Sequence, residues 1–382
     1  MSSTLRAVSG PYTTTDVSTV LPQSNSSPTT MRNDKPCFYS EYRVGTLVLF
    51  YWSTNQPYIL IVLCLIGNGL TLLGSWERCR RSSAHYYMVV LAAADSLVIG
   101  QYAGIFLANN YVKNFASTDA VCKTLVAFED FTVYFAVWLL VFMTIDRCNA
   151  VTRPLQANRI CTVKRGVITT ITLFIICFSY AALTDGFIIK RLINKDGFAN
   201  CHVIVPQPWN IVHYWVKLSL SVYVPFAILL IVNMIILSAI SKATKRQAEM
   251  TTSQNKRRSS TKKLTIMVVV VCLSFFVLTF PVAIANLLYL EYESMDVATG
   301  AYLNDCDGHG PAYIFIYYLG VLFNYFNNVI NGFVYLASNT QFRNDVAKFV
   351  SRFIPPLRRR YERRNETTIS TVSSSVAISS AK

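Results

Sequence analysis

Seven runs of apolar residues dominate this chain of 382 residues, and each run is long enough to cross a membrane. The hydrocarbon core of a bilayer is about 30 Å thick, and a helix needs about 20 residues to span it. The runs lie at about 56–75, 85–108, 121–147, 165–185, 211–240, 263–289 and 312–337. We therefore predict an all-α membrane protein built as a seven-transmembrane helix bundle.

The composition excludes the main alternatives to a membrane protein. Hydrophobic residues make up 53% of the chain and charged residues only 14%, whereas a soluble domain carries about 25% charged residues. So few charges cannot cover so much apolar surface in water, and disordered, coiled-coil and disulfide-scaffold chains fail for the same reason. We attribute the net charge of +15 to lysines and arginines in the loops that lie beside the bilayer. We therefore expect membrane lipid as a partner, and no nucleic acid.

The positions of the cations predict the orientation of the chain. Of the 35 lysines and arginines, 25 lie in or at the edges of the first, third and fifth connections or after the seventh span. Because cytoplasmic loops are enriched in these residues, we expect a multi-pass plasma-membrane protein with its N-terminus outside and its C-terminus in the cytoplasm. The predicted domains are an extracellular disordered tail (1–50), the seven-transmembrane domain (51–339), and a cytoplasmic segment (340–382) that opens with an amphipathic helix at about 340–353.

Four of the ten cysteines fall on the predicted outer side, namely Cys37, Cys122, Cys201 and Cys306. An even number of cysteines in an oxidising compartment permits two disulfides, and four cysteines allow three pairings. We favour Cys122 with Cys201, which leaves Cys37 for Cys306; the other pairings and free thiols stay open. Asn25 begins a sequon in the outer tail and is a candidate for glycosylation.

Distinct motifs follow one another along residues 50–353, namely Gly67-Asn68, Asp95, Asp146-Arg147-Cys148, Pro281 and Asn331-Gly332-Phe333-Val334-Tyr335. In this order they resemble those of the rhodopsin-like (class A) G-protein-coupled receptors. Asp95 in the second span is an intramembrane carboxylate, which indicates a functional site or a structural polar network. In the family, the matching Asp belongs to a water and sodium cluster that here would include Asn327 and Asn331. Ala136 stands where the family usually has Ser. We therefore expect no bound metal, and a sodium ion at Asp95 is disfavoured.

The third span ends in Asp146-Arg147-Cys148, which resembles the family's Asp-Arg-Tyr motif. Cys122 lies 25 residues before Arg147, about 37 Å along a helix, so the two residues lie at opposite membrane faces. The resemblance implies that Asp146 restrains Arg147 until it meets a heterotrimeric G protein; the alternative is a simple snorkelling anchor. Thr261 replaces the acidic partner that the family often has in the sixth span, so we expect easy basal signalling.

Other motifs of the family are altered in this chain. The sixth span keeps Pro281, but Thr279 replaces the Trp that usually senses ligand. The seventh span ends Asn331-Gly332-Phe-Val-Tyr335, in which Gly332 replaces the family's Pro. The resemblance assigns Asn331 and Tyr335 to activation. The chain is thus identified as a divergent member, most like the peptide receptors of invertebrates.

Charged and polar residues in the outer third of the bundle predict the ligand site. The candidate ligand-binding residues are Glu129, Asp130, Lys217, Asn286 and Tyr325. Glu129 matches the position of an Asp that pairs with ammonium groups in the family's amine receptors, but the cation of Lys217 opposes an amine. A ligand with both signs of charge, such as an Arg-containing peptide, fits better. The alternative is that Glu129 or Asp130 neutralises Lys217 inside the bundle.

Three classes of function remain open. A receptor for an extracellular peptide, in particular a neuropeptide, leads, and a receptor for a small amine or chemosensory cue is second. A seven-span transporter or enzyme is a distant third, because no nucleophile–base or metal-ligand spacing is visible. We therefore expect no enzyme activity, no catalytic residue and no cofactor. The Ser/Thr-rich end of the chain is, by resemblance, a phosphorylation-dependent arrestin site; an inert tail is the alternative.

Overall fold

The computed structural model describes the backbone of residues 43–111, 119–188, 190–193, 199–202, 209–247, 255–292 and 309–353, with side chains over slightly shorter ranges. The predictions for Asn25, Cys37, Cys306 and the Ser/Thr-rich tail lie outside these residues, and so does the side chain of Thr261. These predictions therefore stay untested.

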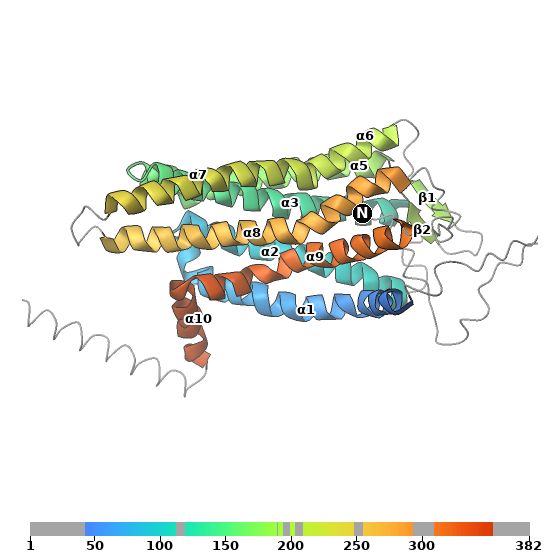
Figure 1. Cartoon of the computed structure of the whole chain (residues 1–382), viewed down its shortest axis with the longest axis horizontal. Helices are drawn as coiled ribbons and strands as arrows, with labels where there is room; N and C mark the ends of the chain where they lie inside the picture. The colour runs from blue at the N-terminus through green and yellow to red at the C-terminus, as the bar shows by residue number, and fades with distance from the viewer. Residues whose placement is uncertain are drawn as a thin grey trace, which may run out of the picture.

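Long helices run side by side and form one bundle (Figure 1). The helices are α1 (Arg43–Cys79), α2 (Ser83–Tyr111), α3 (Asp119–Thr152), α4 (Ala157–Ile160), α5 (Val163–Ile188), α6 (Trp209–Leu218), η2 (Ser219–Tyr223), α7 (Val224–Gln247), α8 (Asn255–Tyr292), α9 (His309–Ser338) and α10 (Thr340–Phe353). The strands are β1 (Lys190–Ile193) and β2 (Ala199–His202). The fifth predicted span is divided among α6, η2 and α7.

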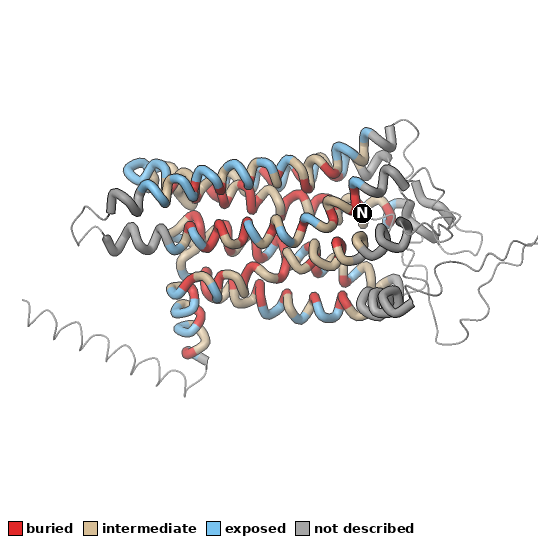
Figure 2. The backbone as a smooth tube through the Cα atoms, in the orientation of Figure 1, coloured by how far each residue is buried: buried red, intermediate tan, exposed pale blue. Residues whose placement is uncertain are grey.

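The predicted membrane bundle is confirmed. Six helical spans within the described residues are long and apolar enough to cross a bilayer, and α9 corresponds to the seventh predicted span, although its outer side chains are not described. Buried residues line the inward faces of the helices and exposed residues the outward faces (Figure 2). Several exposed residues of α5 are apolar, namely Ile168, Ile171, Phe174, Ile175, Ile176 and Phe178. Such a surface is suited to contact with lipid.

The bundle has two different ends, called here the hairpin end and the α10 end. At the hairpin end, β1 and β2 pair in antiparallel register with Arg191 opposite Cys201, and both strands contact α3. The sequence analysis did not predict these strands, because they are only four residues long. At the α10 end, α10 turns away from the direction of α9 and lies across the end of α1 (Figure 1).

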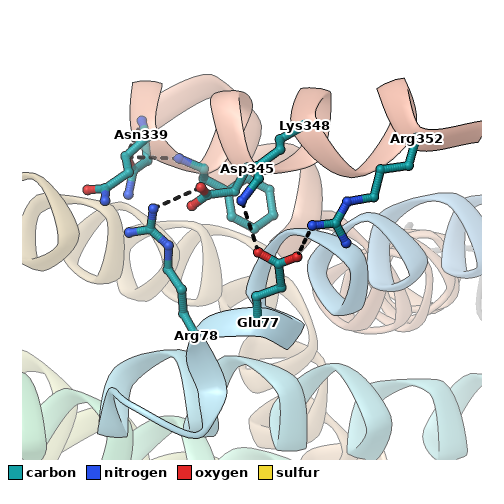
Figure 3. A network of polar contacts seen from close by, with 8 residues as sticks. Glu77, Arg78, Asn339, Asp345, Lys348 and Arg352 are labelled. Carbon is teal, nitrogen blue, oxygen red and sulfur yellow. Dashed lines mark hydrogen bonds and ion pairs between the residues drawn. The ribbon is translucent and has the colours of Figure 1, made fainter. Parts of the chain in front are cut away.

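Ion pairs connect α10 to the last turn of α1 (Figure 3). Arg78 Nη2 lies 2.8 Å from Asp345 Oδ1, and Glu77 pairs with both Lys348, at 3.3 Å, and Arg352. Exposed ion pairs of this kind contribute little individually. Together, however, these ion pairs determine which turn of α10 lies against the last turn of α1, because each pair joins one defined turn of each helix.

Apolar packing and a helix cap hold α10 more firmly. A Cβ on Gly74 of α1 would lie 2.6 Å from the Phe342 ring and 2.8 Å from Val346, so the two helices touch closely there. Asn339 Oδ1 accepts a hydrogen bond from the backbone N–H of Gln341 at 2.9 Å, which caps the first turn of α10. The amphipathic helix therefore occupies the range expected from its sequence and is docked on α1.

The fifth span contains a π-helical turn instead of a simple proline kink. The backbone N–H of Val224 donates to Ser219 O, five residues earlier. The next donor in this register would be Pro225, which has no N–H, so the carbonyl of Leu220 loses its backbone partner. Trp138 Nε1 on α3 donates to Leu220 O at 3.2 Å. The indole therefore supplies the hydrogen bond that the proline cannot supply.

Replacing Trp138 with Phe should destabilise this turn. The variant W138F leaves an intramembrane carbonyl without its donor, and we expect a loss of about 1 kcal/mol or more in the free energy of unfolding. Thermal unfolding of the purified chain in detergent should show the midpoint falling by several degrees. The matched control is Trp215→Phe, since Trp215 is 36% exposed on α6. Equal midpoints for the two variants would contradict the assignment.

Candidate functional site

An ion pair connects α3 and α6 near the hairpin end. Lys217 Nζ lies 2.6 Å from Asp130 Oδ2, and their side chains are only 15% and 7% exposed. Lys217 is in the last turn of α6, immediately before the π-helical turn. Such a buried pair is costly to break, because either charge alone would be left uncompensated. Asp130 therefore neutralises Lys217 inside the bundle, which is the alternative to ligand binding that the sequence analysis left open.

Glu129 faces a different neighbourhood from Asp130. Consecutive residues of a helix point about 100° apart, and the Glu129 carboxylate interacts electrostatically with Tyr102 of α2 and Tyr325 of α9. These two rings stack with their centroids 3.9 Å apart. Within the described residues, the Glu129 carboxylate has no ion pair and no hydrogen bond. A carboxylate beside tyrosine rings is a suitable site for a ligand cation.

Asn286 and Val282 show how α8 borders this region. Tyr214 of α6 donates its hydroxyl hydrogen bond to the carbonyl of Asn286 at 2.9 Å. The Nδ2 atom of Asn286 is buried and has no hydrogen-bond partner among the described residues. A Cβ on Gly320 of α9 would lie 2.7 Å from the Val282 backbone, so α8 and α9 are in close contact there.

Asp95 is the centre of a polar cluster in the middle of the bundle. Asn331 Nδ2 donates to Asp95 Oδ2 at 2.8 Å, across α9 and α2. Asn327, the other predicted member, makes no hydrogen bond through its side chain within the described residues. Asn68 of α1 instead joins α9, since its Nδ2 donates to the carbonyl of Asn328 at 3.1 Å. The structure thus supports Asn331 as a neighbour of Asp95 and adds Asn68 to the cluster.

The residues around Asp95 suit water better than a sodium ion. Hard cations are bound by several oxygen ligands, and Ala136 contributes none. Three buried polar atoms of the cluster region have no hydrogen-bond partner among the described residues, namely Asn68 Oδ1, Asn331 Oδ1 and Tyr335 Oη. Buried groups of this kind are commonly satisfied by internal water. The expectation that a sodium ion is disfavoured at Asp95 stays a prediction.

Arg147 is held in a four-residue network near the α10 end. Its guanidinium pairs with Asp146, and its Nη2 donates to Ser83 Oγ at 3.0 Å. Ser83 in turn donates to Asp146 Oδ2 at 2.9 Å. Burial, followed by the charge of Asp146, raises the pKa of the Cys161 thiol to about 11, so the protonated thiol donates to the carbonyl of Asp146 at 3.3 Å. Arg147 is therefore paired with Asp146 in this arrangement, and its restraint before it meets a G protein stays a prediction.

Ser83 and Cys161 were not singled out from the sequence. Their neighbours in the chain carry no motif that predicts contact with Asp146, and only the packing of α2 and α5 against α3 brings them there.

Cys122 at the hairpin end of α3 is disulfide-bonded. Cys201 lies on β2, which contacts α3, but its side chain is outside the described residues. The pairing of these two cysteines stays a prediction, and so does that of Cys37 with Cys306. The free cysteines among the described residues are Cys64, Cys79, Cys148, Cys161, Cys177 and Cys272.

Gly332, which replaces the family's proline, lies where α9 crosses α1. A Cβ on Gly332 would lie 1.8 Å from the carbonyl oxygen of Gly67, and a Cβ on Gly67 would lie 2.3 Å from the carbonyl oxygen of Val329. Both obstacles are backbone atoms, which cannot move aside as a flexible side chain can. The glycine that stands here in place of the family's proline therefore lies at a very close backbone contact between α1 and α9.

Restoring the family's residue at position 332 should damage this protein. Because any side chain there overlaps the α1 backbone, we expect both Gly332→Ala and Gly332→Pro to lose about 3 kcal/mol or more of stability. Surface expression and the thermal unfolding midpoint of the full chain measure the loss. Gly100→Ala is the matched control, since a Cβ at Gly100 meets nothing within 4 Å. A G332P variant that folds and signals like the parent would refute the close-contact explanation.

The comparisons agree with this architecture. Residues 67–335 match the family model for the 7 transmembrane receptor (rhodopsin family). The chain is 22% identical to the neuropeptide S receptor of Macaca mulatta over 53% of this chain and 52% of that protein. It is 26% identical to the mesotocin receptor of Rhinella marina and to the oxytocin receptor of Ovis aries, in each case over 44% of this chain and 42% of the relative.

These relatives are receptors of vertebrates, so the expected likeness to invertebrate peptide receptors stays a prediction. The chain spans about half the length, or less, of the relatives that it matches. The family model, in contrast, covers more than half of this chain and extends from the first span to the end of the seventh. The chain therefore belongs to the rhodopsin-like (class A) family of seven-transmembrane G-protein-coupled receptors.

Proposed function

We propose that this protein is a plasma-membrane receptor that binds an extracellular peptide and activates a heterotrimeric G protein. The N-terminus and the hairpin end face outward, and the C-terminus and α10 face the cytoplasm, as the distribution of cations favours. The ligand carries a cationic group, which docks on Glu129 close to the stacked rings of Tyr102 and Tyr325. The observation that carries this proposal is the Glu129 carboxylate, which has no ion pair among the described residues and interacts electrostatically with that stacked aromatic pair.

The internal pairing of Asp130 with Lys217 sharpens the chemistry of the ligand. Because these two charges neutralise each other, the ligand need not supply an anion for Lys217. A lysine or arginine side chain, or a free N-terminal amine, satisfies Glu129 alone. The names of the relatives support a peptide, since one group is named for neuropeptide S and two further relatives for mesotocin and oxytocin.

The opposite end of the bundle supports coupling to a G protein. Arg147 is restrained by Asp146 and Ser83, and its release would present a cation to a partner in the cytoplasm. In this proposal Asn331 and Tyr335 transmit the change along α9. Phosphorylation of the Ser/Thr-rich tail would add negative charge and recruit arrestin, while the basic residues near the membrane contact acidic lipid.

A receptor for a small amine is the second candidate, because Glu129 with Tyr325 also suits an ammonium group. The close contact of Gly320 with Val282 and the lack of aromatic residues at Val282 and Ala283 argue against it. A peptide makes further contacts at the hairpin end, whereas an amine depends on Glu129 and its immediate neighbours alone. The two candidates therefore differ in which compounds activate the receptor.

Neutralising Glu129 should weaken the response to a peptide agonist. A screen of amidated peptides and of biogenic amines, with a second-messenger readout in cells, first identifies the agonist. Glu129→Gln keeps the shape of the side chain but removes its charge, so we expect the agonist concentration for half response to rise at least about tenfold. The same change at Glu77, on the exposed surface of the α10 end, is the matched control and should leave the agonist concentration unchanged.

Activation by amines and by no peptide would overturn the peptide assignment in favour of the second candidate. A peptide agonist whose potency is equal on the parent and on E129Q would overturn the docking site but keep the receptor function. Substrate flux across the membrane without any second-messenger response would instead favour a transporter.

A further inference from the structure

A chain of hydrogen bonds connects α3, α7 and α8 inside the bundle, away from the ligand site. Thr144 Oγ1 of α3 and Cys272 Sγ of α8 are 3.3 Å apart. Thr144 Oγ1 also donates to the carbonyl of Leu140 at 2.7 Å. On the other side, Asn233 of α7 interacts electrostatically with the Cys272 thiol, and its Nδ2 donates to the carbonyl of Leu229 at 2.7 Å.

The number of available protons gives this chain a single direction. The Thr144 hydroxyl has one hydrogen, which is used on Leu140 O, so the Cys272 thiol must be the donor to Thr144 Oγ1. Asn233 Nδ2 has two hydrogens, of which one goes to Leu229 O and the other is available to Cys272 Sγ. The relay therefore runs from Asn233 to Cys272 to Thr144, while Asn233 Oδ1 has no hydrogen-bond partner among the described residues.

The relay is enclosed by apolar side chains. Cys272 is 0% exposed, and the residues of α8 around it that are almost completely buried are Met267, Val268, Val271 and Phe275. In such surroundings a polar group that loses its partner cannot find water as a substitute. Each weak sulfur contact therefore matters more than it would on a surface, and separating α8 from α3 breaks the relay at Cys272.

The relay is placed to control the exposure of Arg147. Thr144 precedes Arg147 by three residues on α3, so the two side chains share one face of the helix, about one turn apart. Arg147 is 5% exposed and cannot meet another protein until the helices covering that face separate. A movement of α8 away from α3 would thus break the Cys272–Thr144 bond and uncover the same face.

We propose that the Asn233–Cys272–Thr144 relay is the restraint that holds α8 against α3 and α7 in the resting receptor. The family often uses an acidic residue at the position of Thr261 for such a restraint, and this chain has none there. The relay replaces an ion pair with thiol hydrogen bonds, which are weaker. Basal activity is therefore restrained, in place of the easy basal signalling expected from the sequence alone, and the restraint is weaker than an ion pair. The inference rests on the proposed receptor function.

The test removes one acceptor without changing the volume of the side chain. Thr144→Val keeps the shape of threonine but leaves the Cys272 thiol without an acceptor, whereas Thr144→Ser and Cys272→Ser keep the relay. Thr170→Val is the matched control, because the Thr170 hydroxyl of α5 is buried and has no hydrogen-bond partner among the described residues. Two readouts are needed: the agonist-free second-messenger level per receptor at the cell surface, and hydrogen–deuterium exchange of α8 in the purified full chain.

We expect Thr144→Val to raise the agonist-free signal about threefold to tenfold, the range of one lost hydrogen bond, and to speed amide exchange over residues 264–275. Thr170→Val and the two serine variants should stay close to the parent in both readouts. If Thr144→Val matches Thr170→Val in signal and in exchange, the relay is not the restraint. If serine at position 144 fails to preserve the parental behaviour, the effect comes from packing and the proposal is overturned.

Hydrogen–deuterium exchange of α8 tests the relay separately from the proposed G-protein function. Faster exchange in Thr144→Val with no second-messenger signal from any variant or agonist would support the relay and overturn the proposed G-protein function. If Thr144→Val instead shows an agonist-dependent signal with an unchanged basal level and unchanged amide exchange, the proposed G-protein function is supported and the relay is overturned.

Discussion

A membrane interior offers no water to polar groups, and this constraint governs the whole bundle. A buried donor or acceptor is therefore stabilised by a partner on the same helix or on a neighbouring one, or by an internal water molecule. The pairs Asp95–Asn331 and Asp130–Lys217 meet this requirement between side chains, and the Trp138 indole meets it for a carbonyl beside a proline. These contacts connect α3 with the fifth span and α2 with α9, so they also determine which helices lie side by side.

Close backbone contact is the second constraint. Glycines at Gly67 and Gly332 let α1 and α9 cross with almost no separation, and Gly74 lets α10 pack its Phe342 ring against α1. Small residues commonly allow such contact in membranes, where packing replaces the hydrophobic driving force between helices. At position 332, where the family's motif has proline, the glycine of this chain allows contact between helices.

Much of the fold was predictable because its signal is local. The length and apolarity of each run predict a span, and the alternation of basic and apolar residues predicts α10 as an amphipathic helix. The π-helical turn was not predictable from this periodicity. It inserts one extra residue into the turn and so rotates the preceding residues by about 100°, which changes the direction in which Lys217 points.

The candidate sites were predictable only in part. Sequence resemblance named Glu129, Asp146 and Arg147 correctly as charged residues worth attention, but it did not decide between a ligand and an internal partner for Lys217. Thr144 and Cys272 are ordinary residues in apolar runs, and no local pattern distinguishes them from plain core. The role proposed for them follows from a contact between two residues of different helices that are 128 positions apart in the chain.

The sequence by itself determined the class of the protein, the number of spans and the family, since these depend on hydropathy and on motifs read along one chain. The tertiary structure decided which intramembrane polar groups neutralise each other and which stay available. Consecutive residues such as Glu129 and Asp130 differ only in the helix face on which they lie. That face acquires a meaning only when the neighbouring helices, with their own rotations and irregular turns, are in place.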